Sequence, residues 1–166
     1  MKDKMRTGIG YDVHPLVPGR RLVLGGVNIP FAKGVSGWSD ADVLTHAVID
    51  ALLGAAGRGD IGSHFPPGEP QYKDISSLVL LGKIRDELLE NGWQVVNIDA
   101  TVLAEKPRLR DFIERMRQQL SQALGISASR VSVKASTANG LGFIGSGEGI
   151  AACAIALIEG GKDEDI

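Results

Sequence analysis

Asp12, His14 and His46 are the side chains whose types and spacing could bind a metal ion. Asp12 and His14 follow Thr7–Tyr11, a run typical of a β-strand, and side chains two positions apart in an extended segment point the same way. His46 lies in a predicted helix and could supply a third ligand. Two histidines and one carboxylate are ligands of catalytic zinc sites, which leave a fourth position open. The spacing alone is equally compatible with histidines that lie at the surface or in the core and bind no metal. His64 has no neighbour at ligand spacing and is not expected to bind the ion.

Two turn-rich segments could hold a ligand. Asp60–Glu69 contains glycine and proline and could be either a binding loop or a plain connection. Lys134–Gly149 combines small hydroxyls with many glycines, whose backbone N–H groups suit phosphate oxygens. It lacks the Gly-Lys-Ser/Thr triplet of a P-loop, and no helix is expected after it, which excludes a dinucleotide fingerprint. A tight hairpin and a phosphate site both remain open for this segment.

The elements that must position these residues are strands at both ends of the chain with helices between them. Ser39 is expected to cap the first helix, with Asp42 at the capping-box position, and Gly54 and Gly57 are expected to end the helix. This pattern predicts an α+β fold: a single mixed sheet with helices packed on one face. The expected strands are Thr7–Tyr11, Leu22–Leu24, Val27–Ile29, Trp93–Leu103, Val131–Val133 and Ile150–Ile158; the other helices begin at Ser76 or Ser77 and at Arg110, and end before Gly92 and Gly125.

Composition narrows the class of protein. The 166 residues include 43% hydrophobic and 23% charged residues and carry a net charge of -2. We expect one domain over residues 1–159 and a frayed tail over 160–166. The absence of a basic excess argues against nucleic-acid binding. No apolar run reaches the roughly 20 residues of a membrane span. The first residues do not resemble a signal peptide, and Cys153 is the single cysteine, so a cytoplasmic location is expected.

Five sequence blocks, taken in order, resemble the 2-C-methyl-D-erythritol 2,4-cyclodiphosphate synthase family. The resemblance runs from Arg6 to Glu159, and its blocks are Gly10–His14, Ser39–Val43 with His46, Asp50–Ala56, Gly59–Gly62 and Gly145–Ile150. It implies a CMP-releasing cyclase, a phosphorus–oxygen lyase of the non-mevalonate isoprenoid route. The implied substrate is 4-diphosphocytidyl-2-C-methyl-D-erythritol 2-phosphate. The resemblance also implies a homotrimer with active sites between subunits, one zinc ion per subunit, and a second divalent cation, magnesium or manganese.

The resemblance also assigns site residues. It implies that Asp12, His14 and His46 bind zinc and that Thr137 and Trp38 occupy catalytic positions. The implied substrate-binding positions are Asp12, Val13, His14, Trp38, Ser39, Asp50, Asp60, Ile61, Gly62, Phe65 and Glu69. The implied nucleotide-binding positions are Ala104, Glu105, Lys106, Pro107, Arg108, Leu109, Arg110, Ser136, Thr137, Ala138, Asn139, Phe143 and Ser146. Asp50 is in addition our hypothesis for the acceptor of the second ring N–H of a ligand histidine.

The sequence departs from the family pattern at several of these positions. Trp38 stands where the family usually has a histidine, and indole can donate one hydrogen bond but cannot become cationic. Asn139 replaces a common glutamate, so the second cation would rest mainly on the diphosphate and water. Ser146 replaces an arginine near the trimer axis, which should weaken anion binding there, and Pro67 replaces a common acid.

Two rival functions remain open at this point. A zinc hydrolase could use the same three ligands to activate water, with Asp42 or Asp50 as the general base, and would release free phosphate. The second rival function is that of a non-catalytic trimer that binds nucleotides or isoprenoids, which Trp38 and Asn139 suggest. Such a protein would bind cytidine nucleotides without turnover.

Overall fold

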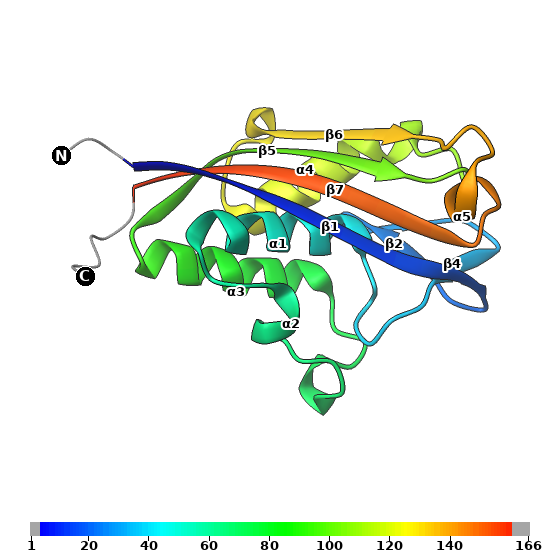
Figure 1. The fold of residues 1–166 in the computed structure, drawn as a ribbon, viewed down its shortest axis with the longest axis horizontal. Helices are drawn as coiled ribbons and strands as arrows, with labels where there is room; N and C mark the ends of the chain where they lie inside the picture. The colour runs from blue at the N-terminus through cyan, green and yellow to red at the C-terminus, as the bar shows by residue number, and fades with distance from the viewer. Residues whose placement is uncertain (1–3, 161–166) are drawn as a thin grey trace.

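A mixed five-stranded sheet forms the frame of the molecule, in a computed structural model that describes residues 4–160 (Figure 1). Its strand order is β4-β1-β7-β5-β6, and only the β5–β6 pair is parallel. The strands are β1 (Lys4–Pro18), β4 (Lys33–Val35), β5 (Trp93–Leu103), β6 (Val131–Ser136) and β7 (Gly149–Gly160). A separate hairpin joins β2 (Leu22–Leu24) to β3 (Val27–Ile29), as the Gly25–Gly26 turn predicts.

The helices cover one face of this sheet, which confirms the predicted α+β class (Figure 1). The long helices are α1 (Val43–Ala56), α3 (Ser77–Glu90) and α4 (Ile113–Leu124); the short ones are α2 (Ile61–His64) and α5 (Gly142–Gly145), with 3₁₀ turns at Pro70–Tyr72, Arg110–Phe112 and Ala128–Arg130. Alternate residues of the strands bury their side chains beneath these helices, and the buried apolar residues form one continuous cluster. The strand predicted at Ile150–Ile158 is the central one, β7.

Strand β1 and helix α1 approach each other closely because β1 carries glycines on the face turned toward the helix. A Cβ atom on Gly10 would lie 1.9 Å from the carbonyl oxygen of Ala47, and one on Gly8 would lie 2.0 Å from that of Ala51. Only glycine can occupy these positions without moving the helix. Asp12 and His14 continue the same face of β1, so this contact directs both side chains toward α1.

The start of α1 differs from the sequence-based prediction. Its N-cap is Asp42, not Ser39, because the Asp42 carboxylate accepts hydrogen bonds from the Thr45 amide at 3.0 Å and from the backbone of the β2–β3 turn. Gly25 and Gly26 each donate one of these bonds, at 2.9 and 2.7 Å. Asp42 is completely buried, so it ties the hairpin to the helix instead of facing solvent.

The prediction differs from the structure at other places too: Gly54 lies inside α1, β6 continues to Ser136, and β4 and α2 were not predicted. Strand β1 is much longer than Thr7–Tyr11, because pairing with β7 continues along its whole length. The helix predicted from Arg110 begins at Ile113, after a 3₁₀ turn. The glycine-rich segment contains the one-turn helix α5, where no helix was expected. Of the tail predicted at 160–166, Gly160 ends β7 and the other residues lie outside the described part of the chain.

The second face of the sheet carries no helix and exposes apolar side chains. Met5, Ile9 and Tyr11 of β1 are 63%, 74% and 52% exposed, and Ile155 of β7 is 53% exposed. Val13 belongs to the same face, which we call the bare sheet face. Ile9 pairs with Ile155 across the two strands, so exposed apolar side chains adjoin one another on this face. Within residues 4–160, no helix combines the length and apolar character needed to cross a bilayer.

Candidate active site

The structure brings Asp12, His14 and His46 together at one point. Asp12 Oδ2 lies 3.1 Å from His14 Nε2 and 3.0 Å from His46 Nδ1. One donor atom from each residue falls within 4.8 Å of the other two, a spacing that can hold a metal ion. Strand β1 supplies two of the groups and helix α1 the third, so the glycine-mediated contact between these elements sets the geometry.

The hydrogen bonds and charges around this triad suit a cation. His14 Nδ1 lies 2.7 Å from the carbonyl oxygen of Ser36, which can only accept, so in the neutral ring Nε2 presents its lone pair to Asp12. Burial opposes ionisation of Asp12, but its contacts with His14 and His46 outweigh that effect and lower its pKa to about 2. Burial alone would lower the pKa of His14, but the contact with Asp12 outweighs burial, so the pKa of His14 is raised. Asp12 is therefore ionised at neutral pH, and a carboxylate with two imidazoles is a donor set that fits Zn²⁺.

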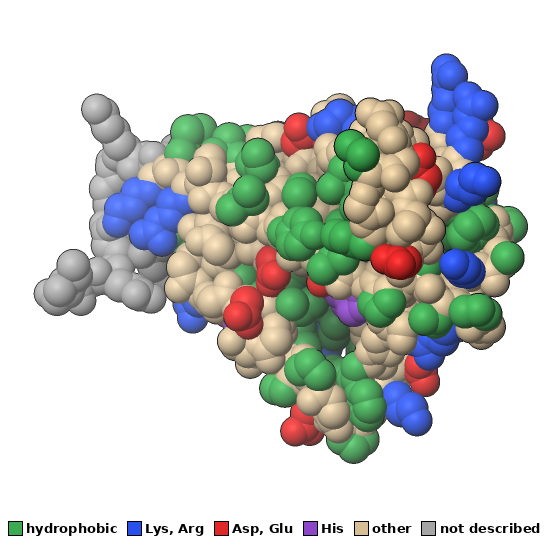
Figure 2. Space-filling model, turned by 45° about the vertical axis from the view of Figure 1, so that its right-hand side comes forward, with side chains coloured by type: hydrophobic (Ala, Val, Ile, Leu, Met, Phe, Trp, Pro, Cys, Tyr) green, Lys and Arg blue, Asp and Glu red, His purple; other side chains and the backbone are tan. Residues whose placement is uncertain are grey.

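A cavity of about 300 Å³ opens beside the triad, and Figure 2 shows histidine recessed in a hollow among hydrophobic side chains. Its walls are mostly apolar and come from the loop after β4, from helix α2 and the loop that follows it, and from helix α3. The predicted metal ligand His46 lines the cavity. So do seven of the predicted substrate-binding residues: Asp12, His14, Trp38, Ser39, Ile61, Gly62 and Phe65. Pro67, Tyr72 and Leu80 complete the wall.

Four predicted substrate-binding residues do not line this cavity. The Val13 side chain lies on the bare sheet face, since side chains alternate along a strand. Asp60 caps α2 through the Ser63 amide at 2.8 Å, and Asp50 accepts a 2.7 Å bond from the Ile61 amide. Glu69 takes part through its backbone, because its carbonyl oxygen accepts the Trp38 indole N–H at 2.9 Å.

The hypothesis that Asp50 accepts a hydrogen bond from a ligand histidine is wrong in this structure. The ring nitrogens of His14 contact Asp12 and Ser36, and those of His46 contact Asp12 and the hydroxyls of Ser77 and Ser39. Asp50 instead positions α2, and burial, aided by the charges of Asp60 and Asp12, raises its pKa. Asp42 is unavailable as a general base because its oxygens are buried under four hydrogen-bond donors.

A second cavity, of about 740 Å³, collects the predicted nucleotide-binding loop. It is lined by Ala104, Glu105, Lys106, Pro107, Arg108, Leu109 and Arg110 together with Ser136 and Thr137, and by Phe31, Ile113 and Ala135. The Ala104 amide donates to the Ser136 carbonyl at 3.0 Å, and the Ala138 amide donates to Glu105 at 3.1 Å. Side chains of Ala138, Asn139, Phe143 and Ser146 lie outside this lining.

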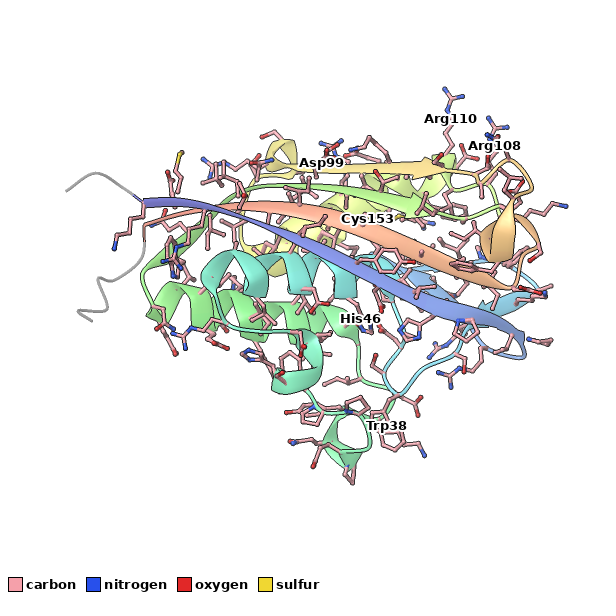
Figure 3. All side chains as sticks on the ribbon, viewed as in Figure 1. Trp38, His46, Asp99, Arg108, Arg110 and Cys153 are labelled. Carbon is pink, nitrogen blue, oxygen red and sulfur yellow. The ribbon has the colours of Figure 1, made fainter. Side chains whose placement is uncertain are left out.

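The two cavities are separate within one chain. Asp12, Ala152, Val102 and Ala135 share one row across strands β1, β7, β5 and β6. Three strand spacings therefore separate the metal triad from the strand that leads to Thr137, about 14 Å at the usual spacing. In Figure 3, Arg108 and Arg110 project from the far edge of the sheet, away from His46 and Trp38. Among residues 4–160, none lines both cavities.

Several residues of the site were missed by reasoning from the sequence. Ser77 contacts His46 directly, and Asp40 acts on it through Ser77. Tyr72 and Leu80 line the metal cavity. Phe31 and Ile113 complete the nucleotide cavity. Asp40 lies in the Ser39–Val43 block of the resemblance, and Tyr72 is an aromatic residue in a turn-rich segment, but the local sequence of the others carries no distinguishing signal. Only the packing of distant segments identifies the others.

Comparison with known proteins agrees with this arrangement. The YgbB family model matches residues 5–159. A 2-C-methyl-D-erythritol 2,4-cyclodiphosphate synthase from Pelotomaculum thermopropionicum is 62% identical over 154 residues, which are 93% of this chain and 95% of that protein. The chain also resembles the bifunctional IspDF from Campylobacter jejuni (TM-score 0.91, 39% identity, 95% of this chain), although it spans only 43% of that chain.

A further solved structure is that of a nucleotide complex. IspF of Plasmodium falciparum, described as a CDP complex, has a TM-score of 0.83 and 31% identity, with 95% of this chain and 97% of that chain covered. The match to the family model and the high sequence identity over nearly the whole chain show to which family this protein belongs. The chain belongs to the YgbB family, that of the 2-C-methyl-D-erythritol 2,4-cyclodiphosphate synthases.

Proposed function

We propose that the chain converts 4-diphosphocytidyl-2-C-methyl-D-erythritol 2-phosphate into 2-C-methyl-D-erythritol 2,4-cyclodiphosphate and CMP, in the non-mevalonate isoprenoid pathway. An oxygen of the 2-phosphate attacks the diphosphate phosphorus nearer the erythritol. The bond from that phosphorus to the bridging oxygen breaks, and the oxygen leaves with CMP. No protein nucleophile is needed, because the substrate carries its own. The observation that carries the proposal is the convergence of Asp12, His14 and His46 beside a cavity, in a chain with this family membership.

The residues around the triad would hold the reacting end of the substrate. Asp12, His14 and His46 would bind a divalent cation, zinc by their donor types, which supplies Lewis-acid polarisation of a phosphate oxygen. The Ser39 hydroxyl accepts the Ala41 amide at 3.2 Å, which leaves its own proton for a phosphate oxygen. Ile61, Gly62 and Phe65 would enclose the methylerythritol and exclude water.

The second cavity would hold the cytidine end. The backbone of Ala104–Arg110 surrounds it, and Ser136 and Thr137 face it at the end of β6. Thr137 would stabilise charge on the reacting phosphates. Asn139 could offer a carbonyl oxygen to a magnesium or manganese ion on the diphosphate. The likeness to the Plasmodium falciparum protein, which is described in complex with CDP, supports a cytidine-linked ligand.

We further propose that the protein is a homotrimer with active sites between subunits. Two observations support this assembly: the exposed apolar side chains of the bare sheet face, and the separation of the two half-sites within one chain. A neighbouring subunit could cover that face and bring its nucleotide cavity to the metal cavity of the first. The cytoplasmic location and the single domain over 1–159 expected from the sequence belong to the same proposal.

Replacing His46 by alanine tests the proposed reaction. The variant loses one of three ligands, so CMP release should fall at least about 100-fold when zinc and magnesium are supplied. The products of the wild type are analysed in parallel: CMP with a cyclic diphosphate supports the cyclase, and free phosphate would support the hydrolase. Cytidine nucleotide binding without turnover would support the binding protein.

His64→Ala is the matched control for this experiment. His64 lies outside the metal cavity, where it contacts the Arg58 carbonyl oxygen and Glu87. Its loss should leave CMP release within about twofold of the wild type, as for a surface substitution. Equal rates for wild type and His46→Ala would contradict the assignment of the metal site.

A further inference from the structure

A chain of side-chain contacts leads from the metal triad into the protein interior. His46 Nδ1 faces Asp12, while His46 Nε2 lies 2.8 Å from the hydroxyl oxygen of Ser77. The Ser77 hydroxyl is in turn hydrogen-bonded to Asp40 Oδ1. Ser77 is fully buried and His46 is 8% exposed, so water does not compete for these contacts. Neither Ser77 nor Asp40 lines the cavity.

The direction of these hydrogen bonds follows from the number of protons available. An ionised carboxylate can only accept, so the single Ser77 proton goes to Asp40. The Ser77 oxygen then offers a lone pair to His46, and Nε2 must donate. A neutral imidazole with a proton on Nε2 has a lone pair on Nδ1, the atom 3.0 Å from Asp12 Oδ2. Unless Nδ1 also carries a proton, these two electron-rich atoms repel each other at that distance, and a metal cation bound between them removes the repulsion.

We propose that Ser77 and Asp40 are positioning residues that fix the tautomer and the ring orientation of His46 for metal binding. The inference rests on the proposed function, since it concerns the same metal site. It differs from the assignment of the ligands, because both residues act through His46 and touch neither metal nor substrate. A carboxylate that orients a histidine ligand is a common arrangement in metal sites; here a serine hydroxyl stands between the two.

The backbone holds this chain of contacts in place. Asp40 Oδ2 accepts the Ser77 amide at 2.9 Å, and the Asp40 amide donates to the Ile75 carbonyl at 3.1 Å. The loop before α1 is thereby joined to the start of α3, the element that carries Ser77. The Ser39 hydroxyl also lies near His46 Nε2, but at 3.2 Å, and it already accepts the Ala41 amide. Ser77 is therefore the stronger acceptor.

The test measures zinc affinity of the full-length protein by chelator competition, without substrate. Ser77→Ala removes only the hydroxyl and leaves the backbone bond to Asp40. Its zinc dissociation constant should rise about 10- to 100-fold, the usual cost of losing such a partner. Asp40→Asn should act in the same direction, because an amide nitrogen facing Ser77 would turn the serine proton toward His46. Ser76→Ala is the matched control: Ser76 is exposed and makes no side-chain cap bond to α3.

A spectroscopic readout separates positioning from general loss of structure. Cobalt replaces zinc, and its visible absorption bands report ligand geometry. Ser77→Ala should shift these bands while its metal-free unfolding temperature stays close to that of Ser76→Ala. Unchanged affinity and unchanged bands would overturn the inference, as would a wild type that binds no metal. A wild type that binds zinc but forms no cyclic product would overturn the proposed reaction and leave the roles of Ser77 and Asp40 to be judged by affinity.

Discussion

Trp38 has one polar atom, and the structure shows where its hydrogen goes. The indole N–H donates to the Glu69 carbonyl oxygen, which holds the Phe65–Tyr72 segment against the metal cavity. Trp38→Phe removes this bond and keeps an aromatic wall. A hydrogen bond of ordinary net strength should raise KM about 2- to 10-fold, with kcat nearly unchanged, in steady-state assays of CMP release. The reason is that a looser loop binds substrate less well but leaves the reacting groups in place.

Trp93→Phe is the control for this prediction. Trp93 is the second of the chain's two tryptophans; it lies at the start of β5, under the Arg6 guanidinium, and lines neither the metal cavity nor the nucleotide cavity. Its kinetic constants should match those of the wild type. A fall in kcat with constant KM for Trp38→Phe would instead mean that the indole acts on the reacting phosphates.

Residue types reveal ligands better than they reveal the partners of ligands. Asp12, His14 and His46 could be selected from the sequence because few side chains bind zinc and their spacing was suggestive. Ser77 could not be selected, since serines are common and its role depends on the packing of α3 against α1. The sequence-based choice of Asp50 failed for the same reason: only the folded chain shows that its carboxylate faces the Ile61 amide.

At the scale of elements, the contact between β1 and α1 determines the distance between Asp12 and His46. Gly10→Ala would place a Cβ atom 1.9 Å from the Ala47 carbonyl oxygen, so the strand and helix must separate. Overpacking of this kind costs typically about 1–3 kcal/mol, and a clash with backbone belongs at the upper end. We expect a matching loss in the free energy of unfolding, measured with denaturant on metal-free protein, and weaker zinc binding by the folded fraction.

Gly54→Ala provides a control on the same helix. Gly54 is exposed, and the nearest atom to an added Cβ is the Ile9 carbonyl oxygen at 3.8 Å, an ordinary contact. Alanine favours the helical conformation, so this variant should be more stable by roughly 0.5–1 kcal/mol. Equal stability of Gly10→Ala and wild type would show that the close approach does not constrain the site.

The elements were predictable where side-chain pattern alone defines them. The β-branched residues of Trp93–Leu103 predicted a strand with the bounds of β5, and Gly57 and Gly125 end their helices in the left-handed conformation that favours glycine. The extent of β1 was not predictable, because its length comes from pairing with β7 at the other end of the chain. The cap of α1 required knowing that the β2–β3 turn lies beside Asp42.

At the scale of the whole molecule, one chain carries two separate cavities. Three strand spacings separate the strand that carries the metal triad from the strand that leads to the nucleotide cavity. The bare sheet face also exposes apolar side chains. The proposed trimer would bring the metal cavity of one chain to the nucleotide cavity of another, and it would remove the exposed apolar face from water.

Mixing two inactive variants tests this arrangement directly. His46→Ala lacks a metal ligand, and Thr137→Ala lacks the hydroxyl that faces the nucleotide cavity. If each active site combines the metal half of one subunit with the nucleotide half of another, random assembly of equal amounts makes about one quarter of the sites fully wild-type. Unfolding and refolding the two variants together should therefore restore CMP release to roughly a quarter of the wild-type rate, by the same count. A mixture of His46→Ala with His14→Ala, both changed in the metal half, should stay inactive. Recovery in neither mixture, from oligomers shown to have exchanged subunits, would place both halves of each site in one chain and rule out the intersubunit site.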